Sequence, residues 1–220
     1  LFYSRASAYA VLSACGDFRK FVIWSMSNTV LITGASRGIG EATAILAGKR
    51  GFNVCVNYLN NAEAAERVVA KIVGSGGNAT AFRADVSAEA DVRELFRKID
   101  ALYGQVTQLV NNAGILETQM RVEDMTLARF QRIIKANLDS CFLCSKEAIR
   151  RMSTKHGGTG GAIVNVSSIA ARTGAPGEYA DYAASKAAVD AFTLGLSKEV
   201  ADEGIRGNAV GPAGIHTGIH

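Results

Sequence analysis

Short apolar runs alternate with longer amphipathic segments along the chain from residue 29 to residue 210. The apolar runs are rich in β-branched residues and predict strands, whereas apolar positions spaced three and four apart predict helices. The predicted strands cover residues 29–33, 53–58, 79–84, 107–111, 162–168 and 206–210. The predicted helices cover residues 39–50, 62–73, 88–102, 127–152 and 179–201.

The repeated strand–helix–strand order indicates the class of fold. This order is typical of a parallel sheet with helices on both faces. The predicted strands are continuous apolar runs, as expected when both faces of the sheet are buried. The helical period is clearest in residues 88–102, whose apolar face contains Val92, Leu95, Phe96, Ile99 and Leu102. We therefore predict an α/β fold, a doubly wound parallel sheet in three α/β/α layers.

The composition is that of one globular domain. Of 220 residues, 48% are hydrophobic and 20% charged, with 23 Gly and 2 Pro, which excludes disordered, collagen-like and disulfide-stapled chains. The net charge of +4 is scattered without a long basic run, so we expect no nucleic-acid partner. No apolar stretch approaches the ~20 residues that span a bilayer, so we expect no membrane protein either.

The cysteines are predicted to be structural. Cys141 and Cys144 form a C-x-x-C pair, but no second pair or histidine cluster completes a metal site, so we expect no metal. Both fall on an apolar helical stripe. Its other members are Phe130, Ile133, Ile134, Asn137, Leu138 and Phe142. Buried, unpaired thiols suit a reducing compartment, which predicts a cytoplasmic protein.

Residues 1–25 have neither a clean period nor the ordered regions of a signal peptide, and the chain begins with Leu. We expect Met26 to be the native start, residues 1–25 to be a non-native or disordered extension, and residues 26–220 to form the domain. Another interpretation stays open, in which the first segment targets or binds something, because Arg5 and several serines are features of transit peptides.

A glycine-rich loop joins the first predicted strand to the first predicted helix. Glycine lets backbone amides approach a pyrophosphate, and the N-terminus of a helix adds unpaired N–H groups. In a strand–helix–strand unit, this loop predicts a dinucleotide site. The candidate residues are Gly34, Ser36, Arg37, Gly38, Ile39 and Gly40.

The end of the second strand bears on the choice of dinucleotide. An NAD site usually has an acidic residue there for the ribose 2′-hydroxyl, and residues 54–60 contain none. Arg37 can instead pair with a 2′-phosphate, with Asn57 as a neutral hydrogen-bonding neighbour. We therefore favour NADP(H) over NAD(H) as the cofactor. The alternative for Arg37 is a solvated loop arginine.

Tyr182 and Lys186 stand four residues apart, on one face of a predicted helix. A nearby positive charge favours the phenolate. A tyrosine that exchanges protons near neutral pH needs its pKa lowered by about three units from about 10. The pair is a candidate acid/base, although this spacing also arises by chance.

Four motifs occur in order along the chain. They are TGASRGIG at 33–40, NNAG at 111–114, VSS at 166–168 and Tyr182-x-x-x-Lys186. Together they resemble the short-chain dehydrogenase/reductase family, with most similarity to its bacterial 3-oxoacyl-carrier-protein reductase-like and glucose 1-dehydrogenase-like branch. The resemblance runs from residue 29 to the C-terminus and implies a Rossmann fold.

The resemblance also implies roles for individual residues. Tyr182 is the acid in carbonyl reduction and the base in the reverse reaction, Lys186 lowers its pKa and holds the nicotinamide ribose, and Ser168 hydrogen-bonds the substrate oxygen. Asn137 holds a water that completes a proton relay. Further residues implied to contact the cofactor are Asp85, Val86, Asn112, Ala113, Gly114, Pro212 and Thr217.

The chain departs from the family pattern near its end. Gly207 occupies a strand position, Ala213 replaces a glycine after Pro212, and the expected last helix and strand are missing before the chain stops at His220. We expect an NADP(H)-dependent oxidoreductase of a small-molecule carbonyl or secondary alcohol, acting as a homodimer or homotetramer. The alternatives are a non-catalytic dinucleotide-binding or redox-sensing module and an inactive truncated fragment.

Overall fold

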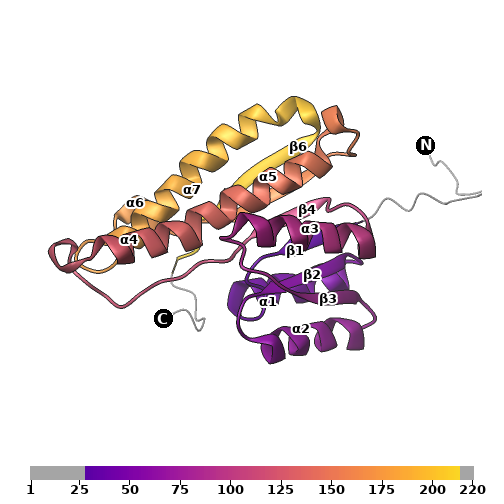
Figure 1. The fold of residues 1–220 in the computed structure, drawn as a ribbon, viewed down its shortest axis with the longest axis horizontal. Helices are drawn as coiled ribbons and strands as arrows, with labels where there is room; N and C mark the ends of the chain where they lie inside the picture. The colour runs from indigo at the N-terminus through magenta and orange to yellow at the C-terminus, as the bar shows by residue number, and fades with distance from the viewer. Residues whose placement is uncertain (1–27, 214–220) are drawn as a thin grey trace, which may run out of the picture.

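The computed structural model describes residues 28–213. The predicted extension at residues 1–25 and the candidate Thr217 lie outside the described residues. Within them, strands alternate with helices in the predicted order (Figure 1).

Each predicted strand and helix is confirmed, with its ends displaced by at most two residues. The strands are β1 (Thr29–Ile32), β2 (Asn53–Tyr58), β3 (Asn78–Arg83), β4 (Gln108–Asn111), β5 (Gly161–Val166) and β6 (Ile205–Val210). The α-helices are α1 (Gly38–Lys49), α2 (Ala62–Gly74), α3 (Glu89–Tyr103), α4 (Leu127–Ile134), α5 (Ser140–Met152), α6 (Ala170–Thr173) and α7 (Ala180–Glu199). The predicted helix 127–152 consists of α4 and α5, joined by a π-helical turn at Lys135–Asp139.

The strands are all parallel and lie in the order β3-β2-β1-β4-β5-β6. The chain runs outward from β1 to β3, returns to β4 beside β1, and then runs outward again. This order confirms the predicted doubly wound Rossmann sheet. Such folds bind ligands where the order reverses, at the carboxyl ends of the strands.

Helices cover both faces of the sheet (Figure 1). Side chains that follow one another in a strand point to opposite faces. Accordingly, Leu31 packs in a core with α3 and α5, whereas Val30 and Ile32 pack in a second core with α1 and α2. Burial on both sides explains why the strands are continuous apolar runs.

Three apolar side chains predicted on buried faces are exposed instead. Leu102, in the last turn of α3, is 54% exposed. Phe130 is exposed on α4, which extends beyond the sheet (Figure 1). Phe142 is exposed on α5 and contacts Phe192 edge-on, with ring centres 6.2 Å apart. The apolar face of a helix can therefore be wider or longer than the part of it that packs against the sheet.

The cysteines of the described part are buried free thiols. They are Cys55, Cys141 and Cys144, and the last two lie in the core as predicted. Burial raises the pKa of each thiol, that of Cys141 to about 12. These groups therefore stay protonated near neutral pH.

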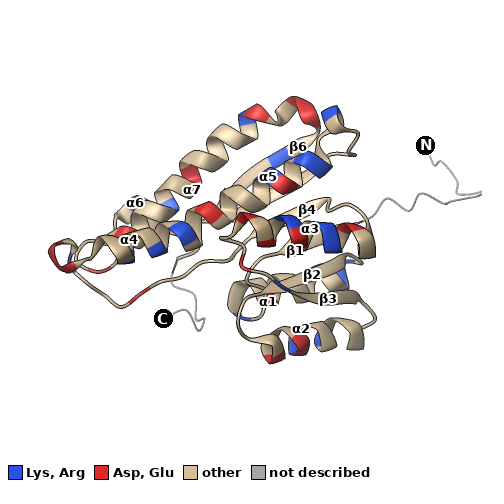
Figure 2. Cartoon of the chain, viewed as in Figure 1, with Lys and Arg blue, Asp and Glu red and all other residues tan. Residues whose placement is uncertain are grey.

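Charged side chains of both signs are interspersed along the helices (Figure 2). Between residues 28 and 213, no helix has the length and apolar character needed to cross a membrane. In the same range, no three His, Cys, Asp or Glu residues are grouped so that they can hold a metal ion.

Candidate active site

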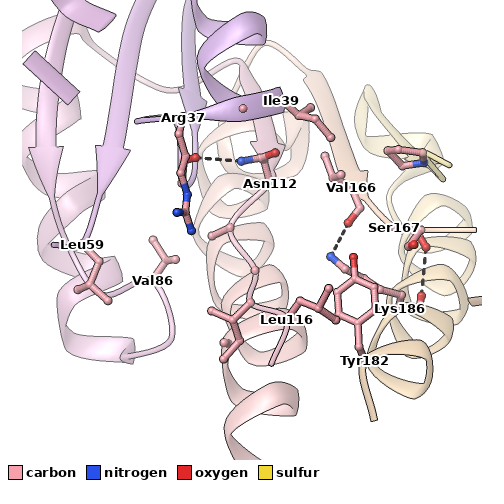
Figure 3. Close-up of a pocket in the computed structure, with 18 of the residues that line it drawn as sticks. Arg37, Ile39, Leu59, Val86, Asn112, Leu116, Val166, Ser167, Tyr182 and Lys186 are labelled. Atoms are coloured by element: carbon pink, nitrogen blue, oxygen red, sulfur yellow. Dashed lines mark hydrogen bonds between the residues drawn. The ribbon is translucent and has the colours of Figure 1, made fainter. Parts of the chain in front are cut away.

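A cleft of about 1300 Å³ lies at the carboxyl ends of the strands (Figure 3). Segments that follow β1, β2, β3, β4 and β5 line it, together with the start of α7. The predicted site residues that line it are Gly34, Ser36, Arg37, Gly38, Ile39, Asn57, Asp85, Val86, Asn112, Ala113, Gly114, Ser168, Tyr182, Lys186 and Pro212. Gly40 and Asn137 are not part of this lining.

The glycine loop packs directly against the segment that follows β4. Gly34 has a φ of +60°, and a Cβ there would lie 3.0 Å from the Ala113 Cα. A Cβ at Gly40 would lie 2.6 Å from Asn112 Nδ2 and 2.7 Å from the Gly34 carbonyl oxygen. Both positions therefore require glycine for backbone packing, in addition to any contact with a ligand.

Thr33 and Asn112 hold these two segments together. Thr33 Oγ1 accepts hydrogen bonds from the N–H groups of Asn112 and Ala113, both at 2.9 Å. Asn112 Nδ2 donates to the carbonyl oxygens of Thr33 and Gly34 at 2.9 and 3.0 Å. The loops after β1 and β4 thus form one unit at the point where the strand order reverses.

The N-terminus of α1 meets the cleft at Gly38 and Ile39. Its N-cap residue, Arg37, makes no side-chain capping bond to the first amides of the helix. Amides at a helix N-terminus attract anions, and Gly38 adopts a φ of +59° that suits glycine. These features, with the close packing at Gly34 and Gly40, fit the pyrophosphate of a dinucleotide.

Arg37 and Asn57 meet the cleft differently. The exposed Arg37 side chain extends from the glycine loop into the open space of the cleft (Figure 3). The buried Asn57 side chain accepts from the Gly34 N–H at 3.2 Å and donates to the carbonyl oxygens of Phe82 and Ala84. Asn57 lines the cleft, and its role as a neutral hydrogen-bonding neighbour of Arg37 at a 2′-phosphate stays a prediction. Its buried amide satisfies backbone groups and ties the loop to β3.

The turn after β3 brings Asp85 and Val86 to the wall of the cleft. Asp85 Oδ1 accepts hydrogen bonds from Ser87 N and Oγ at 2.9 and 2.7 Å. Asp91 accepts from the Asp85 N–H at 3.1 Å. The Asp85 carboxylate therefore shapes a turn that presents the apolar Val86 to the cleft (Figure 3).

Ser168, Tyr182 and Lys186 meet where β5 ends and α7 begins. The Ser168 side chain is near enough to the Tyr182 hydroxyl to affect its pKa, and Lys186 Nζ lies 5.6 Å from the centre of the Tyr182 ring. Lys186 is buried and donates to the Val166 carbonyl oxygen at 2.7 Å. Tyr182 and Lys186 lie side by side at the cleft (Figure 3), so the structure brings together the three predicted catalytic side chains.

The pKa of Tyr182 differs in direction from the sequence expectation. Burial raises the pKa of Tyr182, and the smaller effect of Ser168 lowers it. Burial also lowers the pKa of Lys186 to about 8, against smaller opposing effects of Cys141 and Asp190. Lys186 is not among the groups that shift the Tyr182 pKa in the protein alone, so the expected lowering stays a prediction for the protein with its nicotinamide bound. The neutral phenol is the stable form near neutral pH.

Asn137 lies in the π-helical turn between α4 and α5. Its Nδ2 donates to the Ile115 carbonyl oxygen and to Ser185 Oγ at 3.1 and 3.0 Å, and its Oδ1 accepts from the Ile115 N–H at 2.7 Å. Both amide protons are used, so only oxygen acceptors of Asn137 remain for a water. A Cβ at Gly114 would lie 3.0 Å from Asn137 Oδ1 and 3.5 Å from Lys186 Nζ. Asn137 therefore holds the segment after β4 beside Lys186.

A family model described as short chain dehydrogenase matches residues 28–220. The chain belongs to the short-chain dehydrogenase family. The predicted family, and within it the branch similar to 3-oxoacyl-carrier-protein reductases, is confirmed. The protein is therefore an oxidoreductase that acts on CH–OH or C=O groups, and its family implies a nicotinamide dinucleotide as cofactor.

Individual relatives cover most of this short-chain dehydrogenase. The uncharacterized oxidoreductase YgfF of Escherichia coli K12 is 52% identical over 190 residues, which are 86% of this chain and 77% of the relative. A 3-oxoacyl-[acyl-carrier-protein] reductase of Synechocystis is 40% identical over 87% of this chain and 75% of its own. A 3beta-hydroxysteroid dehydrogenase of Mediterraneibacter gnavus is 42% identical over 91% and 71%. The crystal structure of a dehydrogenase/reductase from Sinorhizobium meliloti 1021 has a TM-score of 0.82 and 32% identity, covering 88% of this chain and 74% of that one.

Sequence reasoning missed several polar residues that support the site of this short-chain dehydrogenase. Ser185 Oγ donates to the Tyr182 carbonyl oxygen at 2.7 Å, and Arg129 forms a buried pair with Asp181 at 2.7 Å. One signal was present for Arg129, which lies four residues before the buried Ile133 and so on the buried face of α4. Thr33 carries no such signal, because its partners are distant in the sequence.

Proposed function

We propose that this protein is an NADP(H)-dependent carbonyl reductase or alcohol dehydrogenase in which Tyr182 exchanges the proton. One observation carries the proposal. Tyr182 lies beside Ser168 and the buried Lys186 ammonium, at a cleft suited to a dinucleotide. A polarised hydroxyl, a hydrogen-bond donor and a cation are together what reduction of a carbonyl requires.

In the direction of reduction, the Tyr182 hydroxyl donates its proton to the carbonyl oxygen of the substrate. Ser168 donates a hydrogen bond to the same oxygen and stabilises the negative charge that develops there. Lys186, held by the Val166 carbonyl, places a positive charge near the phenolate that remains. A bound nicotinamide is the source of hydride for reduction and its acceptor for oxidation.

The preference for NADP(H) rests on charge at one end of the cleft. The pyrophosphate would lie at the amides of the glycine loop and of the α1 N-terminus. The exposed Arg37 guanidinium extends into the cleft nearby, and residues 54–60, at and after the end of β2, carry no carboxylate. A 2′-phosphate gains a charge-assisted contact there and meets no carboxylate from residues 54–60.

The lining around Tyr182 favours a small carbonyl compound with an apolar body. This part of the cleft is lined by Ile115, Leu116, Ile169, Pro176 and Tyr179. Burial of apolar surface supplies binding energy there, while Ser168 and Tyr182 provide the polar contacts. The names of two relatives, an oxoacyl reductase and a hydroxysteroid dehydrogenase, agree with such a substrate class.

The first experiment measures NADPH and NADH binding by fluorescence and then NADPH oxidation with β-ketoacyl, sugar-derived and simple carbonyl compounds. We expect turnover that prefers NADPH. Tyr182→Phe should keep NADPH affinity and lose turnover roughly a hundredfold or more, whereas the control Tyr103→Phe, on α3 with its hydroxyl on Thr80, should keep both. Full turnover by Tyr182→Phe would contradict the proposal.

A second experiment tests the cofactor preference. Arg37→Ala should weaken NADPH binding by roughly ten- to hundredfold and leave NADH binding nearly unchanged, because a single charge-assisted contact is worth about 1.5–3 kcal/mol. The control Arg97→Ala removes an exposed arginine of α3 that pairs with Glu94. An equal loss for both dinucleotides in Arg37→Ala would contradict a 2′-phosphate contact.

We also propose a homodimer or homotetramer that acts in the cytoplasm, with residues 26–220 as its catalytic domain. Exposed apolar side chains on α5 and α7, Phe142 and Leu194, offer surface for contact between copies. The buried free thiols suit a reducing compartment. Sedimentation analysis of the wild type and of Phe142→Glu tests the assembly, and a wild type that sediments as a monomer contradicts it.

A further inference from the structure

Arg129 on α4 and Asp181 in the first turn of α7 form a buried ion pair that the proposed proton transfer does not use. Arg129 Nε lies 2.7 Å from Asp181 Oδ2, and the two side chains are 5% and 1% exposed. Neither residue lines the cleft. Asp181 Oδ1 accepts from the Tyr182 N–H at 2.8 Å. The pair therefore reaches the backbone of the proposed proton donor.

The same arginine holds residues 115–121, here called the wall segment, whose first two residues, Ile115 and Leu116, line the cleft. Arg129 Nη1 donates to the Thr118 carbonyl oxygen at 2.8 Å and lies 3.7 Å from the Met120 sulfur. The Met120 N–H donates in turn to the Glu178 carbonyl oxygen at 2.9 Å, just before α7. One guanidinium thus joins the wall segment to the start of the Tyr182 helix.

We propose that Arg129 and Asp181 are positioning residues that fix Tyr182 and the wall segment relative to each other. The inference rests on the proposed role of Tyr182 as proton donor. A carbonyl compound bound between the wall segment and α7 then contacts the Tyr182 hydroxyl and the wall segment at a fixed distance from each other. Displacement of a reacting group by about 1 Å can lower turnover a hundredfold.

A purely structural role explains the pair less well. Burial of two charges carries a desolvation cost that well-packed apolar side chains avoid. Arg129 Nη2 is buried with no hydrogen-bond partner among residues 28–213, which adds to that cost. Arg132 already ties the wall segment to α4 through two 3.0 Å bonds to Glu117 at the surface. Arg129 is the residue that extends this connection to α7.

Hydrogen exchange of the full chain, followed by mass spectrometry, tests the connection without any need for turnover. The variant R129M/D181N removes both charges at similar side-chain volume. We expect exchange to become roughly tenfold faster both in residues 115–121 and in residues 180–186. The matched variant R132M/E117Q should accelerate exchange in residues 115–121 alone. Unchanged exchange in either segment of R129M/D181N, or equal acceleration of both segments by R132M/E117Q, would overturn the proposal.

Arg129→Lys tests the connection with less risk to folding. Lysine keeps the positive charge beside Asp181 but lacks the planar fork that also reaches the Thr118 carbonyl. We expect a KM for the carbonyl substrate raised roughly fivefold, with kcat within about twofold of wild type. R129M/D181N should instead lose kcat roughly ten- to hundredfold at unchanged NADPH affinity. Wild-type kinetics in both variants would overturn the proposal.

A control variant tests whether the loss of any partly buried ion pair lowers activity. Arg151→Met removes the contact of Arg151 with Asp100, which links α5 to α3 and lies outside the cleft lining. It should leave kcat and KM within about twofold of wild type, and a loss equal to that of R129M/D181N would overturn a specific role for Arg129.

Different results would refute the positioning inference and the proposed function. A wild type that oxidises no NADPH with any carbonyl compound refutes the proposed function, and the exchange experiment alone still tests the link between the two segments. If Tyr182→Phe abolishes turnover but R129M/D181N retains it, the proposed function stands and the positioning inference is refuted.

Discussion

Gly40→Ala tests how closely the glycine loop is packed against the segment after β4. A Cβ at this position would lie 2.6 Å from Asn112 Nδ2 and 2.7 Å from the Gly34 carbonyl oxygen. Asn112 has little freedom to retreat, because its Nδ2 donates to the carbonyls of Thr33 and Gly34 at 2.9 and 3.0 Å. The added methyl group must therefore displace backbone or break these bonds.

The magnitude follows from both effects. Loss of two hydrogen bonds costs about 2 kcal/mol, and overpacking adds about 1–3 kcal/mol. We expect Gly40→Ala to lower the free energy of unfolding by about 3–5 kcal/mol and Tm by roughly 6–20 °C for a domain of this size. NADPH affinity should fall by roughly tenfold or more, because the loop and the start of α1 move together.

The assay combines thermal unfolding at fixed protein concentration with NADPH titration by fluorescence. Gly74→Ala is the matched control, because a Cβ on this residue of α2 meets nothing within 4 Å. Its free energy of unfolding should stay within about 1 kcal/mol of wild type. If Gly40→Ala unfolds within about 2 °C of wild type and binds NADPH equally well, the reasoning from close packing is refuted.

Three further predictions concern buried polar groups. Burial lowers the pKa of Lys186 from 10.5 to about 8, which reduces the free energy of unfolding by roughly 3 kcal/mol below pH 8, an effect that is relieved as pH rises toward 10.5. The Tm of Lys186→Met minus that of wild type should therefore be larger at pH 7 than at pH 10. A difference in Tm that does not depend on pH contradicts this. Asn57→Asp places a carboxylate against two backbone carbonyls, which raises its pKa when folded, so thermal unfolding should show less stability at pH 8 than at pH 5 relative to wild type. Alkylation of native protein followed by peptide mapping should leave Cys55, Cys141 and Cys144 unmodified until unfolding, because burial keeps these thiols protonated; rapid labelling of the native protein contradicts it.

The fold was predictable because its signals are local. The spacing of Val92, Leu95, Phe96 and Ile99 is sufficient to identify α3, and all four are buried. Alternation of such helices with apolar runs implies a parallel sheet. Carboxyl ends of parallel strands meet at one edge, and residues just after separate strands, such as Gly34, Asn112 and Ser168, accordingly line one cleft.

The polar contacts of the site were less predictable because they depend on burial and on distant partners. Asn57 follows the pattern of a ligand-binding residue, yet its amide is buried on Phe82 and Ala84. The direction in which the Tyr182 pKa shifts depends on how deeply the phenol is buried. The four-residue spacing of Tyr182 and Lys186 gives no information about that burial. Leu102 was wrongly predicted to be buried for a related reason, because a helix can extend beyond the surface on which it packs.

One short stretch of backbone after β4 connects the two halves of the site. At its start, Asn112 and Ala113 bond to Thr33 and pack on the glycine loop. Two residues later, Ile115 bonds to Asn137, and Gly114 approaches Lys186 so closely that a Cβ would lie 3.5 Å from Nζ. The glycine loop and Lys186 are thus held by the same four residues. A change that loosens this stretch at either end should therefore impair dinucleotide binding and proton transfer together. A change at Arg37 should instead impair dinucleotide binding alone, and a change at Tyr182 should impair proton transfer alone.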